Sequence, residues 1–461
     1  MKIASIFGAG ANVVILCRVW LVFALLFIFT PAQAATASDF RKDFEAAKSA
    51  TESVNAFAFE MYRELAKHEK GDIFFSPYSI SSAMAMLYAG ASGEAEMEIR
   101  DVMHYEPDVH ESMMHLRKVL DITAAFDLMK VAASVSRSQD AYDEENRLGA
   151  PVELLVANAV WPSNRLKLLD AYRGTIKKYY GAEITTLDYA EKWREAEDVI
   201  NSWTEERTRG VIKNLIPRDM LAGMGFVITN SIYFKSGWTY EFQETDTTDA
   251  PFYNGGKKKS VKMMHQHIGD IGYSESPEFQ IIRLTYNVTP GNSGLGVYSM
   301  VVVLPRDEKT GEDRGERLSS VEAGLTYEKF AESLPPASLR RNAVFDIFLP
   351  KFEAEQNLDV VDHFKRLGLK AIFEQKSDTL NRMHEKDGYL YWVTNILHKA
   401  HVAIDEKGSE AAATAITAGL RTGSKPIPAP EKIEFRADHP FMYFIMNYDT
   451  ILFIGRYTGP K

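Results

Sequence analysis

Apolar positions recur at helical spacing in several stretches of the first half of the chain. Residues 53–66 carry large apolar side chains three and four positions apart, which predicts an amphipathic helix. Residues 79–91 are mostly small and apolar, which predicts a buried helix, and residues 195–208 predict a further amphipathic one. The residues expected to face inward from this last helix are Val199, Ile200 and Trp203.

Strand-forming residues dominate the second half of the chain. Aromatic and β-branched residues gather in 226–234, 298–304 and 345–348. Residues 436–453 contain two aromatic, apolar runs, and the polar stretch Asn447-Tyr448-Asp449 between them predicts a hairpin. Helix and strand patterns are mixed without regular alternation, so the sequence predicts an α+β fold rather than a doubly wound one.

Polar segments interrupt these patterns. Residues 130–150 and 306–324 are charged and rich in serine or glycine, and both are predicted to be surface loops. Residues 35–52 form a polar N-terminal extension, which we expect to be frayed over 35–50. The remaining chain, residues 53–461, is predicted to be a single domain.

The first 34 residues resemble a secretory signal peptide. An apolar run over 19–29 is followed by Ala32-Gln33-Ala34, an A-x-A cleavage pattern, so we expect cleavage after Ala34. The run is short for a membrane span, although an uncleaved anchor is the alternative. No later segment is apolar enough to span, so we expect a secreted, extracellular protein without membrane attachment after cleavage.

Composition narrows the function further. The chain has 461 residues, of which 46% are hydrophobic and 25% charged, and a formal net charge of -10 that argues against nucleic acid as a partner. The single cysteine, Cys17, lies within the predicted signal peptide, which excludes disulfides, thiol nucleophiles and cysteine-bound zinc from the mature protein. Its stability must therefore come from a large core.

Enzyme motifs are missing from the sequence. It contains no G-x-S-x-G elbow, no P-loop and no H-E-x-x-H pattern. His265 and His267 could bind a metal from one face of a strand, but no nearby carboxylate cluster completes a site. We therefore expect no metal and no cofactor.

A serine, histidine and aspartate arrangement is also conceivable. Ser76, Ser79, His398 and Asp405 have the residue types of a catalytic triad. However, Ser76 opens a predicted buried helix and His398 lies in a strand-like run. A buried hydrogen-bonded cluster fits these positions better, so we expect that the protein is not an enzyme.

The segment over residues 405–425 has a composition unlike the rest. It is rich in alanine, threonine and serine, and has too few bulky residues to anchor a permanent helix or strand. In an extended strand alternate residues share one face, and here that face is small throughout: Ser409, Ala411, Ala413, Ala415, Thr417 and Gly419. Such a strand could enter a packed interior without overpacking it. A flexible exposed linker is the alternative.

This segment resembles the hinge of the reactive-centre loop of serpins, in the stretch E-K-G-S-E-A-A-A-T over residues 406–414. Nearly the whole chain from Ser53 to Pro460 shares the resemblance. Further matching motifs are Ile73–Ile80, Asn201–Lys213, Thr229–Trp238, Lys351–Glu353, His398–Ala400 and Phe435–Phe441. Two departures are Asp72, where family members usually have asparagine, and a longer connection between Arg421 and Phe435.

The resemblance implies a serpin fold with three β-sheets, eight to nine helices and an exposed reactive-centre loop at about 406–434. It implies an inhibitor that a serine protease cleaves and that then inserts its hinge into a sheet, a known mode of strand addition. The implied hinge residues are Glu406, Gly408, Ser409, Glu410, Ala411, Ala412, Ala413 and Thr414. The implied conformational switch consists of Ser76, Ser79, Asn230, Trp238 and His398. We expect a monomer, and a non-inhibitory carrier, storage or chaperone role is the alternative.

The cleaved bond is predicted from the loop length. Counting from Gly408, the usual length places Thr422 just before the bond, and Arg421 lies one residue earlier. A trypsin-like protease prefers arginine or lysine there, which favours Arg421-Thr422. Thr422-Gly423 is second, and Lys425-Pro426 is last because cleavage before proline is poor.

Overall fold

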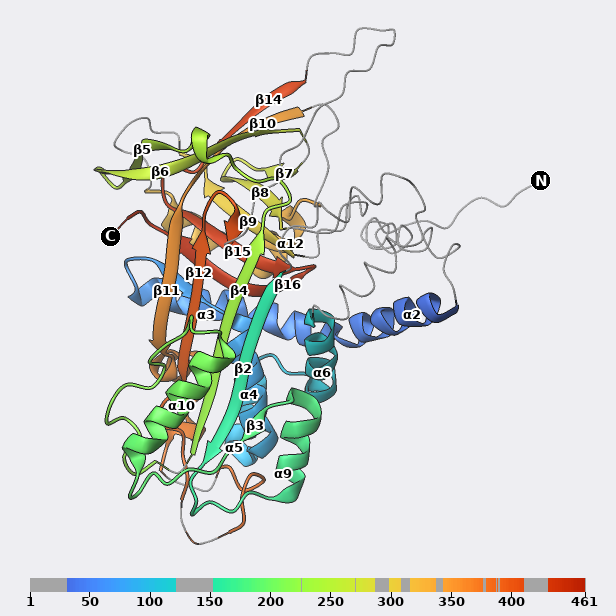
Figure 1. The fold of residues 1–461 in the computed structure, drawn as a ribbon, viewed down its shortest axis with the longest axis vertical. Coiled ribbons are helices and arrows are strands. Elements are labelled where there is room, and N and C mark those ends of the chain that lie inside the picture. The colour runs from blue at the N-terminus through green and yellow to red at the C-terminus, as the bar shows by residue number, and fades with distance from the viewer. Residues whose placement is uncertain are drawn as a thin grey trace, which may run out of the picture.

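The computed structural model places most of the chain in three β-sheets surrounded by helices (Figure 1). The residues it describes are 31–121, 152–224, 226–269, 271–286, 298–307, 316–336, 343–375, 379–386, 388, 390–409 and 430–460. The predicted signal peptide up to residue 30 and the insertion at 130–150 lie outside them, as do residues 410–429.

The largest sheet runs along the length of the molecule (Figure 1). Its strands, in spatial order, are β11 (Phe352–Asp359), β12 (Leu397–Ile404), β4 (Phe226–Gly237), β2 (Glu153–Pro162) and β3 (Glu183–Ile184). A short strand, β13 (Gly408–Ser409), pairs with the end of β4 outside this order. Neighbouring strands are antiparallel except for two pairs, β12 with β4 and β2 with β3.

The other two sheets lie beside the upper half of the large sheet (Figure 1). The second contains β1 (Ile73–Phe75), β16 (Thr450–Tyr457), β15 (Phe441–Asn447), β9 (Tyr298–Pro305), β8 (Phe279–Thr285) and β7 (Gly272–Glu275). The third contains β14 (Glu431–Arg436), β10 (Ala343–Pro350), β6 (Lys257–Ile268) and β5 (Thr248–Asn254). Strands β15 and β16 form the hairpin that the sequence predicts, with its turn at Tyr448 and Asp449.

Ten α-helices surround the sheets in the described part of the chain. They are α2 (Pro31–Ala46), α3 (Lys48–His68), α4 (Pro77–Gly90), α5 (Gly93–Val102), α6 (Val109–Leu120), α9 (Asp170–Thr175), α10 (Trp193–Arg207), α11 (Leu318–Gly324), α12 (Tyr327–Ser333) and α13 (Val361–Leu367). Shorter turns are η2 (Ile176–Tyr180), η3 (Glu244–Asp246) and η5 (Ala371–Phe373). Within these ranges, no helix is both long and apolar enough to cross a membrane.

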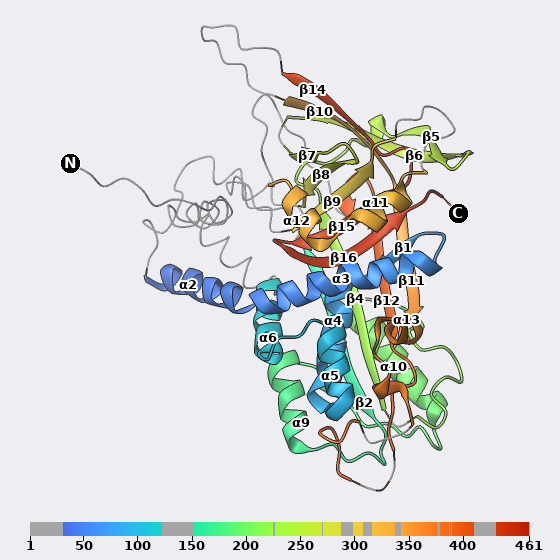
Figure 2. The same ribbon diagram turned by 180° about the vertical axis from the view of Figure 1, so that it is seen from behind.

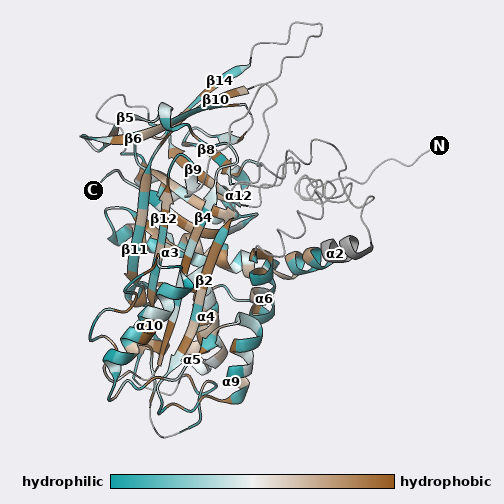
Figure 3. Ribbon diagram, in the orientation of Figure 1, coloured by the Kyte–Doolittle hydropathy of each residue, from teal (hydrophilic) through white to brown (hydrophobic). Residues whose placement is uncertain are grey.

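Helices α4 and α10 cover opposite faces of the large sheet (Figures 1 and 2). Helix α4 is almost wholly buried, as its small and apolar sequence predicts. Helix α10 is amphipathic, and Figure 3 shows its hydrophilic surface against the more hydrophobic strands behind it. Its Ile200 packs with Trp161 of β2 in a second, smaller core. The predicted α+β fold is therefore confirmed.

Three sequence predictions differ from the structure. The extension expected to be frayed is helical in α2, where Phe44 packs edge-on against Tyr448 with ring centroids 5.3 Å apart. The predicted loop 306–324 ends in helix α11, and Val199 is 44% exposed rather than inward-facing. Helix α2 depends on a tertiary contact that the local sequence pattern does not contain.

A buried ion pair fastens α11 to the second sheet. Arg456 of β16 donates to both carboxylate oxygens of Glu322 at 3.0 and 3.2 Å, and both residues are almost completely buried. The Tyr62 hydroxyl of α3 donates to the same carboxylate at 2.6 Å, and Arg456 Nε donates to the Gly71 carbonyl at 2.7 Å. Because every charged group is paired, removal of one partner leaves the other uncompensated.

We predict that Glu322→Gln lowers the free energy of unfolding by about 3–5 kcal/mol, because it leaves the buried Arg456 charge unpaired. Urea unfolding followed by tryptophan fluorescence measures the change. The matched control is Lys262→Met, which breaks an exposed pair with Asp249 (2.9 Å) and should cost less than about 1 kcal/mol. Equal losses in the two variants would contradict the role given to the buried pair.

Candidate functional site

The parallel junction between β4 and β12 is the shortest contact in the middle of the large sheet. Only four register pairs join the two strands, from His398 opposite Asn230 to His401 opposite Tyr233. By contrast, β4 pairs with β2 over its first ten residues and β12 pairs with β11 along its whole length. Beyond either end of these four pairs, β4 and β12 are not joined to each other in the described residues.

At the upper end of this junction, the chain turns back beside β4. Strand β12 leads into a tight turn over 405–408, in which the Asp405 carboxylate accepts the backbone N–H groups of Lys407 (2.9 Å) and Gly408 (3.2 Å). Gly408 and Ser409 then pair antiparallel with Gly237 and Ser236. The implied hinge thus begins as a short strand at the top of the sheet.

Only glycine fits at position 408. Its φ is 131°, in the region that favours glycine, and a Cβ there would lie 2.3 Å from the Ser236 carbonyl oxygen. The backbones of β13 and β4 can therefore approach closely at this point.

Glu406 anchors the turn through its side chain. Its buried carboxylate accepts hydrogen bonds from Lys351 Nζ (2.8 Å) and Thr247 Oγ1 (2.9 Å). Burial alone would raise the pKa of this carboxyl, but the bonds from Lys351 and Thr247 outweigh it and hold the pKa below its ordinary value. The charged form of Glu406 is thus favoured where the hinge leaves the sheet.

Trp238 lies directly under the same turn. Its indole Nε1 donates to the Asp405 carbonyl and its backbone N–H donates to the Lys407 carbonyl, both at 2.9 Å. The ring is stacked on Tyr286, with centroids 4.5 Å apart and an angle of 11°. Trp238 therefore links the end of β4 to the first residues of the hinge.

At the lower end of the junction, a small cavity of about 30 Å³ replaces strand pairing. Ile228 of β4, Ile396 just before β12, and Ile80 of α4 are among the residues that line it. Both the hinge above and the cavity below thus lie on the line between β4 and β12. The four register pairs separate the hinge from the cavity.

The predicted switch residues meet at this junction. His398 Nε2 accepts the backbone N–H of Ser76 at 3.0 Å, and the Ser76 hydroxyl oxygen accepts the N–H of Ser79 at 3.1 Å, capping α4. Asn230 lies opposite His398 and donates to the Asn158 side-chain carbonyl of β2 at 2.5 Å. Sheet and helix are therefore connected through buried polar groups.

The same contacts exclude a catalytic triad. Complete burial lowers the pKa of His398 to about 3, so the ring stays neutral at ordinary pH. Its Nε2 is occupied by a backbone N–H, not by a serine hydroxyl, and Asp405 binds the backbone of its own turn. Ser76, Ser79 and His398 therefore form a buried structural cluster, and Asp405 lies apart from it in the turn above.

In the structure, the switch residues and the first hinge residues all lie along the boundary between β4 and β12. Glu410, Ala411, Ala412, Ala413 and Thr414 lie outside the described residues, as do Arg421 and Thr422. The sequence did not indicate Thr247 and Asn158 as partners of the site. It also indicated no role for Lys351, although this residue lies in a matching motif. Thr247 and Asn158 belong to no recognised motif. The pairing of β2 with β4 identifies Asn158, and the hydrogen bond to Glu406 identifies Thr247.

The structure adds one carboxylate to the two histidines that the sequence singled out, whereas the expectation of no metal stays a prediction. Strand pairing places Asp346 of β10 opposite His267 of β6, and its carboxylate lies within bonding distance of both His265 and His267. The sequence did not indicate this cluster because Asp346 is 81 residues from His265.

Acidification should weaken the fold through His398. The pKa of His398 is lower in the folded than in the unfolded protein. The contribution of this histidine to the free energy of unfolding is therefore fully present above about pH 6.5, and it falls by roughly 1.4 kcal/mol per pH unit towards pH 3. We predict that His398→Gln removes about 2 kcal/mol of the stability loss between pH 7.5 and 5.0. Urea unfolding at both pH values tests this, with His401→Gln on the same strand as the control. An unchanged pH dependence in His398→Gln would refute it.

Known proteins are similar to this chain over most of its length. A family model described as serpin (serine protease inhibitor) matches residues 52–460. Serpin B3 of Homo sapiens is 31% identical over 89% of this chain and 100% of its own length. Leukocyte elastase inhibitor of Equus caballus is 32% identical over 88% of this chain and 97% of its own. The crystal structure of maspin gives a TM-score of 0.71 at 24% identity, and the match covers 90% of this chain and 100% of that one. The chain therefore belongs to the serpin family.

Proposed function

We propose that this protein inhibits serine proteases by inserting its cleaved reactive-centre loop into the large sheet between β4 and β12. The observation that carries the proposal is the pairing of Gly408 and Ser409 with β4, directly above the short junction of β4 with β12. A strand that has begun to pair at this point can continue only along the line where the sheet is weakest.

Continuing this register along β4 assigns a partner to each following residue. Because β13 and β4 are antiparallel, Ala411 would pair with Phe234, Ala413 with Ile232, and Gly419 with Phe226 at the far end of the strand. The inserted segment would therefore cover β4 from its last residues to its first.

The composition of the loop fits this register. Phe234 and Ile232 are fully buried in the main core, so residues opposite them must be small. The loop offers alanine at both positions, and the larger Glu410 and Ile416 would fall on the other face. A loop with bulky or charged residues on the core side would not insert.

The predicted cleavage site lies just beyond the inserted segment. If Gly419 reaches Phe226, only Leu420 separates it from Arg421, which leaves almost no free tether. The path from Ser236 to Phe226 measures roughly 35 Å at about 3.4 Å per residue. A protease attached at Arg421 would be carried over this distance, from the top of the sheet to its base.

The chemistry follows the ordinary acyl transfer of serine proteases. The protease serine oxygen attacks the Arg421 carbonyl carbon, the Arg421-Thr422 amide bond breaks, and the amine of Thr422 takes up the proton. An ester then joins the protease to Arg421. Inhibition results when insertion separates and distorts the protease before water hydrolyses this ester, so two rates compete.

The junction of β4 and β12 must open for insertion. The four register pairs must separate, and His398 must part from Asn230 while keeping or exchanging its bond to Ser76. Helix α4 offers a fixed base for this movement because it is almost wholly buried. We propose that Ser76, Ser79, Asn230 and His398 set the resistance to opening.

A trypsin-like protease is the proposed target because of Arg421. Thr422-Gly423 is the second candidate bond, and the Thr422 side chain, which is smaller than that of Arg421, would suit a protease with a narrow pocket. The relative named leukocyte elastase inhibitor makes this second bond worth testing. We further propose that the protein is secreted, on the basis of its predicted signal peptide. As the resemblance implies, we also propose that it acts as a monomer.

We predict that Ala411→Arg converts the inhibitor into a substrate. A guanidinium opposite Phe234 would be buried without a partner, at a cost of several kcal/mol, so insertion should stall while cleavage continues. The control is Ala412→Arg, whose side chain would lie on the opposite face, beside Tyr233 and the half-exposed Lys235. The number of inhibitor molecules consumed per trapped protease measures the effect. Equal stoichiometry for the two variants would contradict the register.

We predict that wild-type protein forms an SDS-stable complex with trypsin and releases a peptide beginning with Thr422. Arg421→Ala should slow capture of trypsin at least about a hundredfold, because the specificity pocket loses its charged partner. Mass spectrometry of the released peptide identifies the bond, and an elastase with a narrow pocket serves as the comparison. Capture of elastase alone, with a peptide beginning at Gly423, would overturn the trypsin-like assignment. The inhibitor proposal fails if no protease in a broad panel is trapped.

A further inference from the structure

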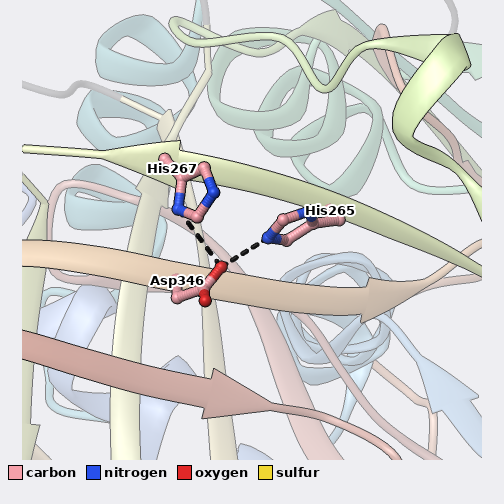
Figure 4. A group of neighbouring side chains, drawn as sticks. All are labelled: His265, His267 and Asp346. Carbon is pink, nitrogen blue, oxygen red and sulfur yellow. Dashed lines mark hydrogen bonds and ion pairs between the residues drawn. The ribbon is translucent and has the colours of Figure 1, made fainter.

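Two histidines and an aspartate meet on one face of the third sheet, away from the junction of β4 and β12. His265 and His267 are two residues apart on β6, so their side chains share a face, and Asp346 lies opposite His267 on β10. Figure 4 shows both rings directed at the same carboxylate. The candidate ligand atoms all lie within 4.8 Å of one another.

The spacing of these atoms suits a tetrahedral ion. Asp346 Oδ1 lies 3.3 Å from His267 Nδ1 and also contacts His265 Nε2. Bonds of 2.0–2.1 Å to a tetrahedral zinc ion hold neighbouring ligand atoms about 3.3–3.4 Å apart. His265 Nε2 lies closer to the carboxylate than this spacing, so the His265 ring or the carboxylate must move apart to admit an ion.

The sheet fixes the orientation of His265. Its ring is stacked on Phe348, with centroids 4.3 Å apart and an angle of 8°. The Arg436 guanidinium of β14 lies over the Phe348 ring at 3.4 Å. Glu434 offsets the charge of Arg436 through hydrogen bonds of 3.1 and 3.2 Å, so this arginine does not oppose a cation strongly.

The donor set selects the class of ion. Imidazole nitrogens together with one carboxylate suit zinc and similar transition metals, whereas magnesium and calcium prefer oxygen ligands alone. The side chains are 26%, 65% and 35% exposed for His265, His267 and Asp346, so an ion can enter from solvent. Three protein ligands also leave a fourth position for water.

We propose that His265, His267 and Asp346 form a binding site for one divalent transition-metal ion of the zinc type. A bound ion would join β6 to β10, the inner strands of the sheet whose edge strand, β14, follows the reactive-centre loop. The site stands on its own geometry and does not depend on the proposed inhibition of proteases.

Isothermal titration of the metal-free full chain with zinc chloride tests the site. We expect one ion per chain in the wild type, and affinity lowered at least about tenfold in both His267→Gln and Asp346→Asn. The matched control is His401→Gln, which removes a single histidine paired with Glu353 (2.6 Å) and should leave zinc affinity unchanged.

Thermal melting of the same proteins, with and without zinc, separates loss of the site from loss of the fold. Zinc should raise the melting temperature of the wild type and of His401→Gln, but not of the two site variants, whose metal-free melting should match the wild type. Cobalt(II) in place of zinc should give the visible absorption of a four-coordinate ion. Absence of saturable binding to the wild type overturns the proposal. It is equally overturned if binding persists in both site variants, since the ion would then be held elsewhere.

Discussion

The short pairing of β4 with β12 is the constraint on which the rest of the site depends. Four register pairs hold the centre of the large sheet closed, with the start of the hinge above them and a small cavity below. If the two strands were paired along their whole length, the hinge would have no path. If they were not paired at all, the sheet itself would not keep the hinge from entering before cleavage. The native structure lies between these two cases.

The contacts around this junction hold the hinge at its starting position. Glu406 is bound by Lys351 and Thr247, and Trp238 fixes the backbone of the turn that follows β12. These bonds resist the departure of the hinge, whereas the buried cluster at His398 resists the opening of the sheet. If the loop inserts after cleavage as proposed, a native state held in this way is stable for kinetic reasons, because a lower free energy becomes accessible once the loop is cut.

Sequence patterns predicted the elements whose stability is local. The buried helix α4, the central strand β4 and the final hairpin all carry strong apolar patterns, and the family motifs predict where the hinge begins. Helix α2 was missed because Phe40 and Phe44 are stabilised by Tyr448, some 400 residues later. Asp346 and Lys351 were missed as partners for the same reason, since pairing between distant strands brings them to His265 and to the hinge. Periodicity cannot report contacts of this kind.

The central claim is that the loop adds a strand to the large sheet after cleavage, and thermal melting tests it most directly. The full chain is melted before and after a single cut between residues 417 and 425, with both fragments retained. Insertion should raise the melting temperature by tens of degrees, well above the few degrees of a typical point substitution. Equal melting temperatures before and after the cut would contradict the account, because the loop would then remain outside the sheet.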